Sequence, residues 1–145
     1  MPGPNDNSWR DDQTIYKSLM AKLGRPLVGT PLSCPIKRNG SYYGWGGAMG
    51  PSQFIPATWQ SYESRISRAV GSSADPWNAR HAIYATAIYV SDLGATAQTY
   101  AAEKDAACKY YSGRSCSDPN VVNAFYGNGV MKHVIDIQAD IALIN

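Results

Sequence analysis

The chain has 145 residues, of which 44% are apolar and 17% charged, and its formal net charge at pH 7 is +2. These values exclude disorder over the whole chain and indicate one globular domain that can bury a hydrophobic core. The lysines and arginines are scattered, which argues against a nucleic-acid partner. No apolar run reaches the length of a transmembrane helix.

The spacing of apolar residues predicts a mainly helical chain with long ordered loops and no strand longer than a few residues. The first helix is expected to have Asp11 or Asp12 as its cap and to stop at Gly24. Residues 25–50, rich in proline and glycine, are expected to form a long loop. A loop of that length in a compact domain is usually functional or anchored.

The same pattern predicts four further helices, at about 56–70, 78–93, 102–111, and from a start between Pro119 and Gly129 to the C-terminal region. Pro56 suits a first helical position, and Gly71 and Gly113 are expected to end their helices. The second of these four, capped by Asn78 or Asp75, is apolar nearly all round. It is therefore predicted to be the buried central helix.

Three cysteines are present, Cys34, Cys108 and Cys116. Cys108 and Cys116 are eight residues apart across a turn, which leaves open either a disulfide closing a short loop or two reduced thiols. Cys34 is left over. An odd cysteine in a secreted protein indicates a free thiol or a partner elsewhere.

Titratable residues give little indication of a catalytic or metal site. His81 and His133 lack Cys, Asp or Glu at ligand spacing, so no metal or cofactor is expected, and surface or capping roles are favoured. The only glutamates are Glu63 and Glu103. A general acid near neutral pH needs an apolar setting, which neither position offers, and Glu63 is predicted to lie on a solvated helix face.

The segment GWGGAMGPSQFIPATW, residues 44–59, is uncharged and has one amide side chain, Gln53, near its middle. Its glycines, which permit positive φ and close backbone approach, are Gly44, Gly46, Gly47 and Gly50. One interpretation is a tight loop leading into a helix, with Gln53 bonded to the backbone. The other is a sugar-binding wall in which Gln53 meets an acetamido group or a ring hydroxyl.

Four motifs spread over residues 12–143 resemble lytic murein transglycosylases of the MltB-like, lysozyme-superfold family. GGAMGPSQFIPATW resembles the hallmark segment of that family, and DPWNARHAI resembles its helix entry. CKYYSG resembles the Tyr-Asn-Ala-Gly motif of the broader group, with Tyr111 where the pattern has Asn. FYGNGVMKHV resembles the tyrosine-containing helix start that follows.

The resemblance implies a lysozyme-like helical domain that acts on peptidoglycan glycan strands in the cell envelope or outside the cell. Such enzymes cleave the MurNAc-β-1,4-GlcNAc bond without water. One glutamic acid protonates the leaving oxygen, and its carboxylate then helps the muramoyl C6 hydroxyl attack C1, giving a 1,6-anhydro sugar. Carried over by position, the substrate-binding residues are Gly47, Met49, Gln53, Phe54, Tyr110 and Tyr126.

The catalytic glutamate of this family precedes the Gly-Ala-Met-Gly segment on a Glu-Ser-x-x-Gly helix, and here no glutamate precedes Gly44. Residues 11–145, after an extension over 1–10, are therefore expected to be the C-terminal portion of such a domain. The acid would come from a preceding segment or another chain, which would also explain the unpaired Cys34.

Two functions stay open. One is a transglycosylase domain whose acid is supplied from outside the chain. The other is a non-catalytic peptidoglycan-binding or structural module that retains the glycan groove. In a third version, Asp12 or Glu63 serves as the acid.

Overall fold

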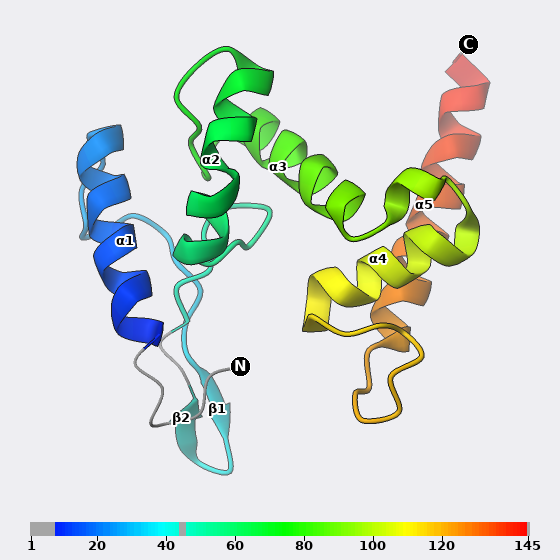
Figure 1. Ribbon diagram of the computed structural model, residues 1–145, viewed down its shortest axis with the longest axis horizontal. Helices are drawn as coiled ribbons and strands as arrows, with labels where there is room; N and C mark the ends of the chain where they lie inside the picture. The colour runs from blue at the N-terminus through cyan, green and yellow to red at the C-terminus, as the bar shows by residue number, and fades with distance from the viewer. Residues whose placement is uncertain (1–7, 44–45, 145) are drawn as a thin grey trace. The chain divides into compact units, whose positions relative to one another are not determined.

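The computed structural model describes residues 8–43 and 46–144, and it confirms that the chain is mainly helical (Figure 1). Its elements are α1 (Ser8–Leu23), β1 (Ile36–Arg38), β2 (Ser41–Tyr43), α2 (Pro56–Val70), α3 (Ala79–Asp92), the 3-10 helix η1 (Ala95–Ala97), α4 (Tyr100–Ser112) and α5 (Ala124–Ile144). The chain divides into two compact units, Met1–Thr86 and Ala87–Asn145. Within the described ranges, none of the helices combines the length and the apolar content that crossing a bilayer requires.

In the first unit α1 packs against α2. Met20 of α1 and Trp59 and Ile66 of α2 are at most 1% exposed, so they form the centre of the core. The predicted start of α1 is wrong, because the helix begins at Ser8 and Asp12 lies within it. The expected boundary between residues 10 and 11 therefore falls inside α1, and residues 1–7 of the expected extension lie outside the described ranges.

The predicted long loop over residues 25–50 contains a β-hairpin. Strands β1 and β2 pair antiparallel, with Arg38 opposite Ser41 next to the turn. Asn39 and Gly40 form that turn with φ of 51° and 80°. Asn-Gly is the favoured two-residue hairpin turn because both positions tolerate positive φ. The sequence thus carried a hairpin signal that the loop prediction overlooked.

Helix α2 begins at Pro56 and ends at a left-handed Gly71, as predicted. The residue before Pro56 is Ile55, whose side chain makes no capping hydrogen bond. The missing cap is supplied by α1, where the Asp12 carboxylate accepts a hydrogen bond of 2.7 Å from the Ala57 N–H. This bond connects the two helices directly.

Helix α3 starts after Asn78, whose side-chain oxygen accepts hydrogen bonds from the N–H groups of Arg80 and His81. This confirms Asn78 as the cap. The prediction of a buried central helix is wrong, because Ala82 and Ala85 are its only buried described residues and Ile83 is 70% exposed. Only the small alanines of its apolar surface are buried.

In the second unit α4 packs against η1 and α5 (Figure 1). Thr99 caps α4 by accepting a hydrogen bond from the Ala102 N–H, and a left-handed Gly113 ends the helix as predicted. Helix α5 begins at Ala124, inside the predicted interval. The buried contact between the two helices uses small side chains of α4 and, from α5, Gly127 and Met131.

Candidate functional site

Gln53 lies at an exposed turn that closes just before α2. Its backbone is left-handed, with φ of 54°. The side-chain amide donates a hydrogen bond of 2.7 Å to the Gly50 carbonyl oxygen, and the Met49 N–H donates one of 2.9 Å to the Phe54 carbonyl oxygen. Gln53 therefore bonds to backbone, as the first interpretation held, while its side chain remains accessible to solvent.

The other predicted groove residues of this segment lie beneath the turn. Met49 is fully buried and bridges to Leu32 and Phe54 through backbone pairing. Phe54 is 4% exposed, with its ring centroid 6.1 Å from that of Trp59, and Gly47 is buried as well. These residues therefore support the Gln53 turn from the core side and do not form an exposed floor.

The glycines of the segment have the positive φ values that the sequence predicts, 77°, 80° and 57° at Gly46, Gly47 and Gly50. A Cβ atom at Gly46 would overlap the Ser33 carbonyl oxygen, and one at Gly50 would overlap the Pro76 carbonyl oxygen. These two glycines thus allow a close approach to the backbone of the chain itself. Gly44 lies outside the described residues.

A polar cluster fixes the turn around Pro76, against which Gly50 packs. The Asp75 carboxylate pairs with Arg25 at 2.6 Å and accepts a hydrogen bond of 2.9 Å from the Trp77 N–H. The Asp75 N–H donates to Nδ1 of His81 at 3.1 Å. His81 therefore braces this turn. Arg25 is 50 residues from Asp75 along the chain, so no local pattern predicts their ion pair.

Glu63 borders a cavity of about 180 Å³ between α1 and α2. Its side chain is 20% exposed and forms an ion pair of 2.6 Å with the exposed Lys22, so Glu63 is partly covered and not fully solvated. An ion pair is the opposite of the apolar setting that a general acid needs. The cavity beside Glu63 is lined by Ile15, Ser18, Leu19, Lys22, Pro56, Trp59, Gln60 and Glu63.

The other glutamate, Glu103, lies in the first turn of α4, where negative charge stabilises the helix.

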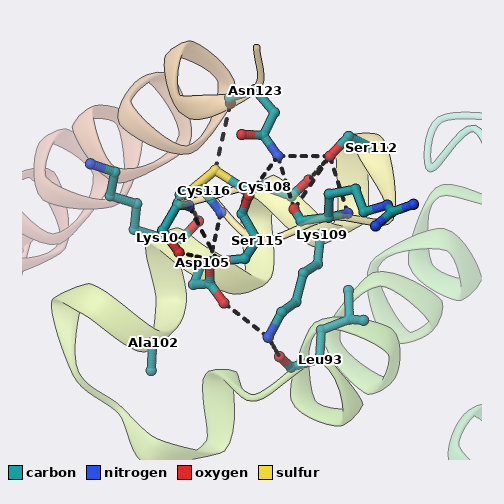
Figure 2. A network of polar contacts seen from close by, with 12 residues as sticks. Leu93, Ala102, Lys104, Asp105, Cys108, Lys109, Ser112, Ser115, Cys116 and Asn123 are labelled. Carbon is teal, nitrogen blue, oxygen red and sulfur yellow. Dashed lines mark hydrogen bonds and ion pairs between the residues drawn. A yellow bond between two sulfur atoms is a disulfide. The ribbon is translucent and has the colours of Figure 1, made fainter. Parts of the chain in front are cut away.

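In the second unit Cys108 and Cys116 form a disulfide, the first of the two predicted arrangements (Figure 2). The Asp105 carboxylate accepts hydrogen bonds from the Ser115 hydroxyl at 2.6 Å and from the Cys116 N–H at 2.8 Å, and it pairs with Lys109 at 2.9 Å. The Ser115 hydrogen bond, followed by that of Lys109, lowers the pKa of Asp105 to about 2. The charged carboxylate thus holds the disulfide loop against α4.

Asn123 secures the other end of this loop. The residue is fully buried, and its amide nitrogen donates to the Ser112 hydroxyl at 2.7 Å and to the carbonyl oxygens of Arg114 and Ser115 at 2.9 and 3.1 Å (Figure 2). Among the described residues its side-chain oxygen has no hydrogen-bond partner. Asn123 was not predicted, because no sequence pattern marks an asparagine that fastens a loop to the next helix.

The two predicted substrate-binding tyrosines lie in different aromatic contacts. The ring centroid of Tyr110 is 5.4 Å from that of Tyr89. Tyr126 stacks on Tyr111, with centroids 4.8 Å apart and ring planes 17° apart. The structure therefore brings together Gly47, Met49, Gln53 and Phe54 in the first unit, and it places Tyr110 and Tyr126 in the second.

In the described part of the chain, no group of three or more His, Cys, Asp or Glu residues is arranged to hold a metal ion. Cys34 is an exposed free thiol. Comparisons with protein-family models, with curated proteins and with solved structures gave no match to the chain.

Proposed function

We propose that the chain binds peptidoglycan glycan strands as part of a lytic transglycosylase whose catalytic glutamic acid lies outside these 145 residues. The observation that carries the proposal is the Gln53 side chain, which is accessible to solvent on a closed turn and is oriented by its 2.7 Å hydrogen bond to the Gly50 carbonyl oxygen. The left-handed φ of 54° does not by itself mark a site, because Gln98 at the end of η1 has a φ of 52°. Gln53 differs from Gln98 in its place within the uncharged segment that resembles the family hallmark.

The Gln53 carboxamide offers groups that suit an N-acetylated sugar. One amide hydrogen is used in the bond to the Gly50 carbonyl oxygen, which orients the side chain. The second amide hydrogen and the carbonyl oxygen match the acceptor and donor of an acetamido group or of ring hydroxyls. Because the turn is closed by backbone bonds and buried side chains, little ordering is needed on binding.

The proposed chemistry needs an acid that the described glutamates are poorly placed to supply. Glu63 is engaged by Lys22, and Glu103 lies in the first turn of α4. A glutamic acid from outside the chain would protonate the glycosidic oxygen of the MurNAc-β-1,4-GlcNAc bond. Its carboxylate would then accept the proton of the muramoyl C6 hydroxyl as that oxygen attacks C1, leaving a 1,6-anhydro end.

Because Glu63 and Glu103 are both poorly placed to act as the acid, a second candidate is a non-catalytic peptidoglycan-binding or structural module that retains the glycan-binding turn. Both candidates require glycan binding and differ only in whether cleavage follows. For either one, the Cys108–Cys116 disulfide favours the cell envelope or the extracellular space, because disulfides persist in oxidising compartments.

The test uses two left-handed glutamines of the chain, Gln53 and Gln98, with φ of 54° and 52°. Replacing either by glycine relieves the same backbone strain, which in Gln53→Gly offsets the lost exposed hydrogen bond to the Gly50 carbonyl oxygen, so both variants should unfold at a temperature close to that of the wild type. Calorimetric titration with a soluble GlcNAc–MurNAc tetrasaccharide should give a Kd about tenfold higher for Gln53→Gly, corresponding to one or two lost hydrogen bonds. Gln98→Gly should bind like the wild type. Equal binding by both variants, or no binding by the wild type, would contradict the proposal.

A further inference from the structure

We propose that three rings of the second unit, Tyr111, Phe125 and Tyr126, form a platform on which pyranose rings of a glycan strand stack. These rings are called the aromatic cluster below. The inference rests on the proposed function and adds Tyr111 and Phe125 to the residues that contact the glycan.

The aromatic cluster is a compact and accessible group. Tyr111 stacks on Tyr126, with centroids 4.8 Å apart, and meets Phe125 edge-on, with centroids 5.5 Å apart and ring planes 76° apart. Tyr111 nevertheless remains 53% exposed and Phe125 58% exposed. Single exposed apolar residues are common on protein surfaces, but here two exposed rings contact each other and one of them stacks on a third ring.

The backbone beneath the aromatic cluster is fixed by buried contacts. Tyr111 follows Cys108 by three residues on α4, and the disulfide ties that part of the helix to Cys116. Phe125 and Tyr126 lie between Asn123, fully buried and bonded to the preceding loop, and Gly127. A Cβ atom at Gly127 would lie 2.7 Å from the Cys108 sulfur, so this turn of α5 rests directly on the disulfide. Rings held in this way lose little freedom when a ligand binds.

The size of the patch favours a sugar over a protein partner. An aromatic side chain has roughly 150–250 Å² of surface to bury, so half exposure leaves on the order of 100 Å² on each of Tyr111 and Phe125. A stable protein interface needs about 800 Å² on each side. A pyranose ring needs far less. Its C–H face suits an aromatic ring, and its hydroxyls suit the phenol groups of the two tyrosines.

The experiment measures binding of chitotetraose, a water-soluble GlcNAc tetramer, to the full chain and its variants. Tyr111→Ala and Phe125→Ala should each raise the Kd about fivefold or more. Tyr100→Ala is the matched control, because Tyr100 is 56% exposed on the same helix as Tyr111 but has no place in the aromatic cluster, and its Kd should not change. Tyr111→Phe keeps the ring and should bind within about twofold of the wild type.

Two further readouts separate failure of the platform from failure of the proposed function. Sedimentation with purified peptidoglycan tests the function. If the wild type sediments, Gln53→Gly sediments less than the wild type, and the alanine variants of the aromatic cluster bind like the wild type, the platform is overturned while the function stands. If the wild type stays in solution, the function is overturned.

In either case, ring-proton NMR signals of Tyr111 and Phe125 in the wild type report on the platform itself. Saturable shifts with chitotetraose support it, and unchanged signals overturn it. A concentration-dependent dimer that Tyr111→Ala disperses would assign the aromatic cluster to a second copy of the chain, and would also overturn the platform.

Discussion

The Asp12 carboxylate in α1 caps α2 from 45 residues earlier in the sequence, accepting a hydrogen bond of 2.7 Å from the Ala57 N–H. Ile55, which precedes the helix, has no side-chain oxygen to do so. Asp12 is 8% exposed, and its carboxylate lies at the positive end of the α2 dipole. This contact orients α2 on α1 directly after the turn that carries Gln53, and it gives Asp12 a structural role.

Replacing Asp12 should therefore weaken the first unit. Asp12→Ala is expected to lower the free energy of unfolding by about 1–2 kcal/mol, because the first turn of α2 loses the side-chain cap that Asp12 provides. Asp12→Asn keeps an acceptor oxygen, so its free energy of unfolding should fall by less than that of Asp12→Ala. Asp140→Ala, at an exposed position of α5, is the control and should stay within about 0.5 kcal/mol of the wild type. Urea unfolding at pH 7 measures all three, and equal losses for Asp12→Ala and Asp140→Ala would contradict the assignment.

Gly50 and Gly71 provide a matched pair for the close approach in the glycine-rich segment. Both have positive φ, 57° and 75°, but only at Gly50 would a Cβ atom meet another group, the Pro76 carbonyl oxygen. Gly71→Ala should lower the free energy of unfolding by about 1 kcal/mol, from backbone strain alone. Gly50→Ala should lower it by roughly 3 kcal/mol or more, because backbone must move. Thermal unfolding compares the two variants. Similar losses of stability would contradict this prediction, because they would show that the Pro76 turn shifts at little cost in free energy.

The lowered pKa of Asp105 predicts that part of the free energy of unfolding is lost in acid. Its pKa is about 2 in the folded chain against an ordinary value of 3.8. Because the folded value is the lower one, the stabilisation is fully present above about pH 4 and is lost as the pH falls toward 2. Asp105→Asn should therefore be less stable than the wild type by about 2 kcal/mol at pH 7. Near pH 2 the difference should largely vanish. Urea unfolding at pH 7, 4 and 2.5 follows this convergence, and a difference independent of pH would contradict it.

Much of the helical fold could be predicted because its signals are local. Pro56, Gly71 and Gly113 act through their own φ preferences, so the start of α2 and the ends of α2 and α4 were confirmed. The Asn39–Gly40 turn is equally local, and its Asn-Gly pair predicts the hairpin. The cap of α2 has no local signal, because Asp12 and Ala57 meet only through tertiary packing.

The candidate site was predicted in part for the same reason. Gln53 could be singled out as one amide among glycines, but the burial of Met49 and Phe54 depends on contacts that no local pattern reports. Glu63 looked solvated because its helix neighbours are polar, and its ion pair with Lys22 arises from the packing of α1 on α2. The aromatic cluster was predicted only at Tyr126, since stacking on Tyr111 requires α4 and α5 to be in place.

We propose above that this chain binds peptidoglycan glycan strands while the acid for cleavage lies outside it. The most direct test incubates the chain alone with purified peptidoglycan, sediments the polymer, and analyses the soluble products by mass spectrometry. The chain is expected to sediment with the polymer and to form no 1,6-anhydromuramoyl products. A chain that stays in solution would contradict glycan binding, and 1,6-anhydromuramoyl products would show that the acid lies within these 145 residues.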